Sequence, residues 1–381
     1  MVRSEFLAKK IKRSVLSKVT DFFSKSKYHA YLVGGYVRDL TLGREPVDID
    51  IVVEGDAIEA AKKLNTKLNG KLSIHKEFGT ASIITTHGLI DLASARIEKY
   101  PSPAMLPHVY PSTIIEDLNR RDFTMNAIAM SIAKENFGEI FDPFNGSDDI
   151  KKGTIRVLQK NSFMDDPTRI FRALRYKNRF GFKLEAKTEE QMEEAIAQNM
   201  IRQLSAQRIF NELRLIFEEL TYQNTNQDIS KLGIFKIKHR DLETLPRFDR
   251  LRIYFYISKL TAINFPLSKM EQKLVHDINR IDKIVAQLLK TSKNSMIYNI
   301  LSPIDEQVRN LIPSLYPELE NKIRIFNRIE NIKPFIDGSD LKDLGFKPNR
   351  QFKHLLKRMF DLQIDKKIVM RKQALELLKN I

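Results

Sequence analysis

The chain has 381 residues, 42% of them hydrophobic, and contains neither Cys nor Trp. The absence of Cys excludes a disulfide framework, a thiolate zinc site and a cysteine nucleophile. No apolar run approaches the roughly 18–20 residues of a membrane span. We therefore expect a cytoplasmic protein without a membrane partner.

The net charge of +16 is concentrated at the two ends of the chain. Residues 1–30 hold eight Lys/Arg and two Asp/Glu, which gives +6, and residues 321–381 hold fifteen and seven, which gives +8. Such ends favour a polyanionic partner, nucleic acid above all. The alternative is that Lys-rich helices only keep the protein in solution.

The first 160 residues mix helical and extended patterns. Helical spacing of apolar residues is seen over 4–27 and 56–69, and strands are predicted over 31–33, 48–53, 80–86 and 89–95, the last two joined by His87-Gly88. The linker 96–113 contains four prolines and is predicted to be an irregular functional flap.

Beyond residue 160 the pattern is almost entirely helical. Helices are predicted over 161–180, 186–198, 205–222, 248–261, 267–290 and 351–361, with prolines between and within them. The sequence thus predicts an α+β protein with a mixed head and a long helical body. We place the boundaries at 1–27 (a basic helix), 28–157 (head), 158–225 (neck), 226–320 (body) and 321–381 (basic tail).

Three carboxylates lie in or beside predicted strands. Asp48 and Asp50 are two residues apart and so share one face of a strand, and Asp91 lies between the apolar Ile90 and Leu92. Carboxylates held this close repel one another, and a divalent cation relieves that repulsion. The alternative for the pair is a solvated strand end.

A glycine pair precedes a cation at a predicted turn from strand to helix. Gly34 and Gly35 allow close approach of an anion to the backbone, and Arg38 adds a fixed positive charge. By itself the pair is equally compatible with a plain tight turn.

Two further segments are rich in arginine. Arg120 and Arg121 precede Asp122, which indicates either a nucleotide contact or an internal ion pair. Asp166, Arg169, Arg172 and Arg175 follow one another every three residues on a predicted helix, with no Glu between Asp166 and Glu185. Like charges at this spacing repel, so we expect an anion such as a nucleoside triphosphate to lie against them.

Three motifs together carry a family resemblance. They are Gly34-Gly35-Tyr36-Val37-Arg38-Asp39 with Leu42-Gly43-Arg44 and Asp48-Ile49-Asp50; Glu116-Asp117-Leu118-Asn119-Arg120-Arg121-Asp122-Phe123-Thr124-Met125-Asn126-Ala127; and Asp165-Asp166-Pro167-Thr168-Arg169-Ile170-Phe171-Arg172-Ala173-Leu174-Arg175-Tyr176 with Arg179-Phe180-Gly181-Phe182. In them the chain resembles the polymerase-β-type nucleotidyltransferases. Within that group it resembles the class II tRNA nucleotidyltransferases, or CCA-adding enzymes, and the bacterial poly(A) polymerases.

The resemblance implies a fold and an activity. The fold would be a polymerase-β-type head followed by an all-α neck, body and tail. The activity would be template-independent addition of CMP and/or AMP from CTP and ATP to the 3′ end of tRNA, with release of pyrophosphate. The partners would be the tRNA acceptor arm, which the basic tail would bind, and the two nucleotides, with no protein partner implied.

The resemblance also assigns roles to residues. Asp48 and Asp50 would hold two Mg²⁺ ions, with Asp91 as a third catalytic carboxylate. The incoming nucleotide would contact the glycine pair, four arginines, one amide and the pair that reads its base: Gly34, Gly35, Arg38, Arg121, Asn126, Arg172, Arg175, Asp166 and Arg169.

Three alternatives share these motifs. An enzyme that adds only A or only CC would have every one of them, and the flap run Pro103–Pro107 resembles such forms. A bacterial poly(A) polymerase would share the head. A non-catalytic RNA-binding module of the same fold is the third, although the retained carboxylate pair argues against it.

Overall fold

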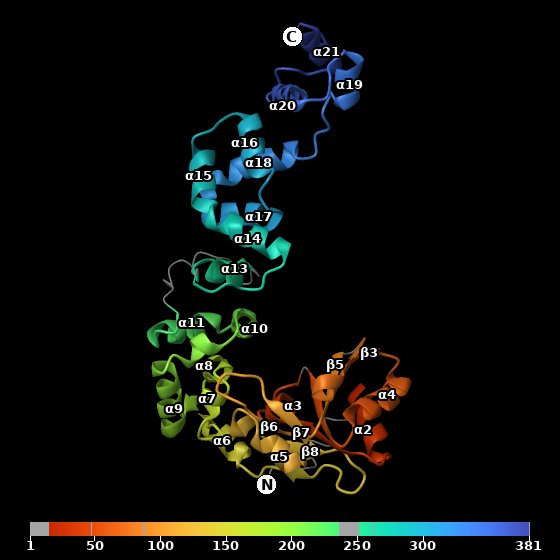
Figure 1. The fold of residues 1–381 in the computed structure, drawn as a ribbon, viewed down its shortest axis with the longest axis vertical. Helices are drawn as coiled ribbons and strands as arrows, with labels where there is room; N and C mark the ends of the chain where they lie inside the picture. The colour runs from red at the N-terminus through yellow and green to blue at the C-terminus, as the bar shows by residue number, and fades with distance from the viewer. Residues whose placement is uncertain (1–14, 47, 87, 236–250, 261, 381) are drawn as a thin grey trace. The chain divides into compact units, whose positions relative to one another are not determined.

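The computed structural model describes residues 15–46, 48–86, 88–235, 251–260 and 262–380 (Figure 1). The chain divides into two compact units, residues 1–234 and residues 235–381. Among the described residues no helix is long and apolar enough to cross a membrane. The predicted α+β organisation is confirmed, because strands of the main sheet are confined to the first unit and helices dominate the rest.

A seven-stranded sheet forms the head. Its strands, in spatial order, are β3 (Lys71–His75), β4 (Thr80–Thr85), β5 (Gly88–Ser94), β2 (Ile49–Glu54), β1 (His29–Val33), β8 (Ala129–Ser131) and β9 (Ile140–Phe141). Strands β2 and β5 run parallel, whereas the other neighbours run antiparallel. The parallel pair places the ends of β2 and β5 at the same edge of the sheet.

Helices cover both faces of this sheet. Helix α4 (Ala57–Leu68) turns a fully buried stripe of three alanines and Leu64 toward β4 and β5, and α2 (Val15–Ser24) packs against it. Asp56 caps the start of α4 by accepting a hydrogen bond from the main-chain N–H of Glu59. On the other face, α5 (Ile114–Asn119) packs with Tyr31 and Val33, which alternate with Leu32 along β1.

The connection from β5 to α5 differs from the prediction. Residues 96–113 were expected to be irregular, but β6 (Arg96–Lys99) and β7 (His108–Pro111) pair as an antiparallel ribbon. The predicted helix over 4–27 is seen as α2, and residues 1–14 lie outside the described residues. The strand predicted over 48–53 begins at Ile49, so Asp48 lies just before it.

Short elements lead from the sheet into the helical neck. They are α3 (Gly35–Thr41), the 3-10 turn η2 (Thr124–Asn126), α6 (Gly146–Lys152), and β10 (Thr154–Ile155), which pairs in parallel with β11 (Lys183–Leu184). The helices of the neck are α7 (Ser162–Asp165), α8 (Thr168–Phe180), α9 (Ala186–Ala197), η3 (Met200–Gln203), α10 (Ala206–Phe217) and α11 (Tyr222–Lys231).

Two predicted helices are interrupted and one predicted boundary falls inside a helix. The helix expected over 161–180 breaks at Asp166, because the following Pro167 forces that residue into an extended conformation (φ −135°, ψ 90°). The helix expected over 267–290 breaks at Arg280. The neck–body boundary predicted at 225/226 lies within α11, and the two units separate at 234/235 instead.

The described elements of the second unit are helices. They are α13 (Leu251–Ser258), α14 (Lys269–Asn279), α15 (Ile281–Leu289), α16 (Asn294–Leu301), α17 (Glu306–Leu315), η4 (Pro317–Leu319), α18 (Glu320–Ile329), α19 (Gly338–Asp343), α20 (Arg350–Ile364) and α21 (Arg371–Lys379). Helix α18 packs on α16 and α17, and a separate apolar core begins at Ile336. The tail predicted to begin at residue 321 therefore has its own core only from about residue 336.

Gly146 lies where α6 packs against η2. A Cβ atom built on it would lie 2.1 Å from the main-chain oxygen of Thr124. We predict that Gly146→Ala destabilises the protein by about 1–3 kcal/mol, because backbone cannot move aside as a side chain can. Gly338→Ala is the control, since its Cβ would meet Phe352 at an ordinary 3.6 Å. Urea unfolding followed by circular dichroism measures both, and equal stabilities would contradict the prediction.

Candidate active site

The three predicted carboxylates gather at the edge of the sheet where β2 and β5 run parallel. Asp50 is in register with Asp91, so their side chains are neighbours on one face. Asp48, just before β2, is exposed. The hydroxyl of Ser82 on β4 donates a 2.5 Å hydrogen bond to Asp91 Oδ1, which leaves the other oxygen of that carboxylate available.

Burial raises the pKa of the Asp50 carboxyl. Arg121 and Arg38 oppose this rise, whereas the nearby Asp91 and Asp48 add to it. A hard divalent cation bound to these oxygens would relieve both the desolvation and the repulsion, so the donor set fits such an ion. Among the described residues no three His, Asp or Glu side chains converge tightly enough to hold an ion by themselves. Phosphate and water would have to complete its coordination.

Position 34 requires a glycine, because the main chain there passes close to an arginine side chain. The φ of Gly34, 64°, lies in the left-handed region, and a Cβ atom there would lie 2.8 Å from Arg121 Nη1 and 3.9 Å from Asp50 Oδ2. Helix α3 begins at the next residue, Gly35, and carries Arg38 one turn later. Because Gly34 has no side chain, the Arg121 guanidinium can lie close to the main chain beside Asp50.

Arg38 is buried and held on three sides. Its Nε and Nη2 donate to Asp39 Oδ1, and its Nη1 donates to Asn126 Oδ1 at 2.8 Å. The guanidinium also lies 5.3 Å from the ring centroid of Tyr176. Asn126, which lies in the 3-10 turn η2 of the second motif, therefore orients Arg38.

Asp122 links that turn to α8. Its Oδ1 accepts hydrogen bonds from the main-chain N–H of Phe123 and from Asn126 Nδ2, and its Oδ2 accepts from Arg172 Nε at 2.7 Å. Although burial opposes it, Arg172 and Asn126 lower the pKa of the Asp122 carboxyl to about 2. The same contact raises the pKa of the Arg172 guanidinium against its burial.

Asp117 holds the two arginines of the second motif. This fully buried carboxylate accepts from Arg120 through Oδ1 and from Arg121 through Oδ2. Arg120 also donates to Glu98 on β6, whose other oxygen accepts from the Tyr100 hydroxyl at 3.2 Å. The ribbon β6–β7 is thereby connected to the arginine pair.

Asp166 and Arg169 are brought together but not as successive positions of one helix. Asp166 precedes α8, and its Oδ1 accepts from the main-chain N–H of Thr168 and from Arg208 Nη2 at 2.6 Å. Arg169 is buried and donates to Ser162 Oγ at 2.6 Å and to the main-chain oxygen of Arg120 at 2.9 Å. The expectation that the pair lies one helical turn apart is corrected, because Pro167 interrupts the helix.

The arginines of α8 are balanced by carboxylates from elsewhere in the chain. Arg172 pairs with Asp122, and the buried Arg175 donates to Glu219 at 3.0 Å. The expectation that the ladder needs an external anion overlooked these partners, which lie far away in sequence. Arg175 is not among the residues that line the cavity described next.

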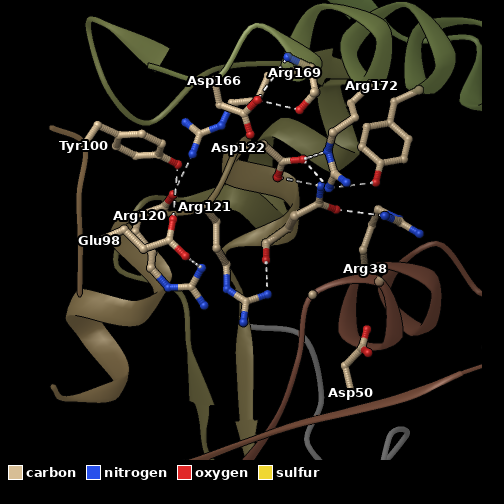
Figure 2. A pocket seen from close by; sticks show the side chains of 15 residues that line it. Arg38, Asp50, Glu98, Tyr100, Arg120, Arg121, Asp122, Asp166, Arg169 and Arg172 are labelled. Atoms are coloured by element: carbon tan, nitrogen blue, oxygen red, sulfur yellow. Dashed lines mark hydrogen bonds and ion pairs between the residues drawn. The ribbon is translucent and has the colours of Figure 1, made fainter. Parts of the chain in front are cut away.

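A cavity of about 450 Å³ lies among these groups, although Asp48 and Asp91 are not among the residues that line it (Figure 2). Of the predicted site residues it is lined by Gly34, Gly35, Arg38, Asp50, Arg121, Asn126, Asp166, Arg169 and Arg172. Figure 2 shows Asp50 at one end and Asp166 with Arg169 at the other. Its volume is typical of a small-molecule site.

The cavity is also lined by residues that were not among the predicted site residues. They are Glu98, Tyr100, Arg120, Asp122, Thr168 and Tyr176. Glu98 and Tyr100 lie in the segment expected to be irregular, so no pattern singled them out. Arg120 and Asp122 belong to the second motif, for which an internal ion pair was one of the two interpretations, and each is in such a pair, with Asp117 and Arg172 respectively.

Comparisons with known proteins agree with this geometry. Residues 30–156 match the family model described as the poly A polymerase head domain. The chain is 30% identical to the CCA-adding enzyme of Staphylococcus saprophyticus over 320 residues, which cover 77% of this chain and 78% of that protein. The chain belongs to the tRNA nucleotidyltransferase family. It is accordingly an enzyme of nucleotidyl transfer.

Other relatives in this family are named A-adding tRNA nucleotidyltransferases. That of Halalkalibacterium halodurans is 29% identical, over 90% of this chain and 86% of the relative. That of Aquifex aeolicus is 44% identical over 84% of this chain but only 43% of the relative.

Solved structures of tRNA nucleotidyltransferases share the fold. An apo CCA-adding enzyme has a TM-score of 0.73 at 28% identity, with 99% of this chain and 98% of that chain covered. The Thermotoga maritima CCA-adding enzyme in complex with tRNA has a TM-score of 0.68 at 26% identity, with coverage of 98% and 97%. Members of this family generally use divalent metal ions, which the carboxylate edge of the sheet suits.

Asp122→Asn should destabilise the protein by about 1–3 kcal/mol, because Arg172 would lose its counter-charge in a largely buried place. The expected loss of stability is smaller than that for a fully buried ion pair, since a third of the Arg172 side chain is exposed (33%). Asp148→Asn, in an exposed pair with Lys151, is the control and should change stability by less than about 0.5 kcal/mol. Urea unfolding at pH 7 measures both differences.

The pH dependence of the stability difference between the wild-type protein and Asp122→Asn tests the contact between Asp122 and Arg172. Because the folded-state pKa of Asp122, about 2, lies below its unfolded-state value, the carboxylate stabilises the fold at neutral pH. This contribution is complete above the unfolded-state pKa and is lost as the pH falls through about 2. The stability advantage over Asp122→Asn should thus be constant from pH 7 to about pH 5 and shrink below it. A pH-independent difference would mean that the pair is only a neutral hydrogen bond.

Proposed function

We propose that the protein adds AMP and/or CMP, from ATP and CTP, to the 3′-hydroxyl end of tRNA and releases pyrophosphate. The supporting observation is the order of groups along one cavity: Asp50 at one end, guanidiniums beside it, and the Asp166–Arg169 pair at the other (Figure 2). Relatives of this chain are named for the same reaction, and neighbouring structures contain tRNA, CTP or ATP.

Asp48 and Asp50 would hold two Mg²⁺ ions, with Asp91 beside them as the third catalytic carboxylate. Bound Mg²⁺ would lower the pKa of the attacking hydroxyl and neutralise charge on the leaving pyrophosphate. The protein's part is to keep the carboxylates together in ionised form. Arg121 and Arg38 contribute to this, since both lower the pKa of Asp50.

The guanidiniums between the two ends would bind the triphosphate. Arg38, Arg121 and Arg172 line the cavity. Arg121 Nε is buried without a hydrogen-bond partner among the described residues, so a donor is available for an anion. Because Gly34 carries no side chain, a phosphate can approach the strand end beside Arg121. We assign Arg175 the indirect role of fixing Glu219 and α8, in place of the direct phosphate contact expected from the sequence.

Asp166 and Arg169 would select the base. Cytosine and adenine each present an amino group beside a ring acceptor, which a carboxylate and a guanidinium match. Thr168 and Arg208 occupy Asp166 Oδ1, so Oδ2 is the oxygen left for the amino group. Ser162 and the Arg120 main chain fix Arg169 in place, so the pair is oriented before a nucleotide arrives.

The tail would bind the tRNA backbone. Helix α20 exposes Arg350, Lys353, Lys357 and Arg358, and none of them is in an ion pair with another described residue. Such a basic helical face suits phosphates, whose neutralisation makes affinity depend strongly on salt. A tRNA substrate would place the protein in the cytoplasm.

Specificity for A alone is the second candidate, because the relatives from H. halodurans and A. aeolicus carry that name. The purified protein should be given labelled tRNA that lacks its 3′ end, ends in C or ends in CC, with each nucleoside triphosphate separately. A CCA-adding enzyme extends all three substrates, whereas an A-adding enzyme extends only the CC end and only with ATP. Long A tails would indicate a poly(A) polymerase, and no extension would overturn the proposal.

Asp50→Asn should reduce transfer at least about a thousandfold and leave the Kd for tRNA nearly unchanged. The carboxylate would serve the metal, whereas affinity for RNA would come from basic helices elsewhere. Single-turnover extension and filter binding measure the two quantities, with the exposed Asp148→Asn as the control. Parallel losses of affinity and rate would contradict the metal assignment.

Arg169→Ala should lose discrimination as well as rate. Removing one contact to the base costs about 1–3 kcal/mol of discrimination, seen as a fall in the ratio of kcat/KM for ATP or CTP to that for UTP or GTP. Ser162→Ala is the matched variant, because it removes only the support of Arg169 and should lower the same ratio less. If Arg169→Ala slows all four nucleotides equally, Arg169 binds phosphate and the base is read elsewhere.

A further inference from the structure

Three guanidiniums surround the ring of Phe180, a residue that does not line the nucleotide cavity. The guanidinium carbons of Arg38, Arg44 and Arg179 lie 4.8, 4.9 and 5.3 Å from the ring centroid of Phe180. They are therefore within about 10 Å of one another, which is the screening length at 0.1 M salt. Cation–π contact with a single ring offsets only part of that repulsion.

The chain supplies too few carboxylates for these cations. Arg38 is paired with Asp39. Arg179 lies 3.7 Å from Glu219, but Glu219 is already bound to Arg175 at 3.0 Å. Arg44 is exposed and has no ion pair with any residue that the structure describes. A positive excess thus remains on the open side of Phe180.

This cluster shares a wall with the nucleotide cavity. Tyr176 lines the cavity and stacks on Phe180, with centroids 5.8 Å apart and planes inclined by 30°. Arg38 also lines the cavity, whereas Arg44 and Arg179 do not. The two outer arginines are consequently one aromatic ring away from the cavity in which the triphosphate would bind.

Arg44 also lies close to the metal end of the site along the chain. It is four residues before Asp48, a stretch of chain that spans at most about 14 Å. A primer whose terminal hydroxyl reaches Asp48 and Asp50 would bring its last phosphates within reach of Arg44. Exposed guanidiniums that are held against an aromatic ring are well suited to bind such a phosphate backbone independently of its base sequence.

We infer that Arg44 and Arg179, supported by Phe180, form a clamp for phosphates near the 3′ end of the RNA primer. The inference rests on the proposed function, because it assumes an RNA substrate. The clamp would set the primer's position and contribute to its affinity, whereas the cavity would bind the incoming nucleotide separately.

The test compares Arg44→Ala, Arg179→Ala and the double variant with the wild-type protein. Each single variant should raise the Kd for tRNA about three- to tenfold, and each lost contact should lower the slope of log K against log salt by about 0.7. At saturating tRNA, kcat and the KM for ATP should stay within about twofold. Arg214→Ala is the control, since that exposed arginine faces Glu218 at 4.0 Å and should change neither quantity.

Two further variants separate charge from stacking. Arg44→Lys retains the salt slope but loses the planar contact with the ring, so its affinity should be intermediate. Phe180→Leu keeps the arginines but removes their platform and should weaken tRNA binding by about threefold. Circular dichroism melts establish whether each variant is folded. If Arg44→Ala is unfolded, Arg44→Lys serves as the test in its place.

Two outcomes overturn the inference. An unchanged tRNA affinity and salt slope in the double variant would show that these arginines are only a solvated surface. A raised KM for ATP with unchanged tRNA affinity would assign them to the nucleotide site. Failure of the wild-type protein itself to bind and extend tRNA would instead contradict the proposed function, so the two failures are distinguishable.

Discussion

The burial of arginine is the constraint on which the rest of the site depends. Arg38, Arg169 and Arg175 are all more than nine-tenths buried, and each needs an acceptor fixed in advance. Asp117 and Asp122 meet the same need for Arg121 and Arg172, from positions that are themselves almost inaccessible. Removing one partner of such a pair is costly, because it leaves a desolvated charge behind. Arg38, Arg121, Arg169 and Arg172 can therefore line the cavity without forming an ion pair with Asp50.

The fold of the head brings the carboxylates and the arginines of the site close together. Because β2 and β5 run parallel within an otherwise antiparallel sheet, Asp50 and Asp91 become neighbours although they are distant in sequence. Gly34 then allows Arg121 to come within contact of the same strand end. The 3-10 turn Thr124–Asn126 orients Arg38 on one side and, through Asp122, Arg172 on the other. One short turn thus sets the position of cations that come from two different helices.

Local patterns predicted the elements and the motif residues, but not the partners. Helix α4, strands β1 and β4 and nine cavity residues could be predicted because periodicity and short motifs are local properties. Glu98 and Arg208 could not, since each acts through a contact with a distant residue, and Tyr100 could not, because it lies in a segment that no pattern singled out. The pairing of Arg175 with Glu219 shows the same limit, because a ladder of like charges in sequence does not reveal the carboxylate that α10 and the turn after it bring to it. The break at Pro167 was the exception, a local signal that helical periodicity outweighed.

The charged residues that line the cavity nearly balance one another. Five arginines line it (Arg38, Arg120, Arg121, Arg169 and Arg172) against four carboxylates (Asp50, Glu98, Asp122 and Asp166), which leaves a formal charge of only +1. That excess is far smaller than the charge of a nucleoside triphosphate, so the protein's own groups orient the phosphates more than they neutralise them. Most of the neutralising charge would have to be bound with the nucleotide, at the edge of the sheet where Asp48, Asp50 and Asp91 lie. A nearly neutral cavity would also bind other polyanions weakly, and the RNA backbone would be bound by the cationic surfaces proposed outside it.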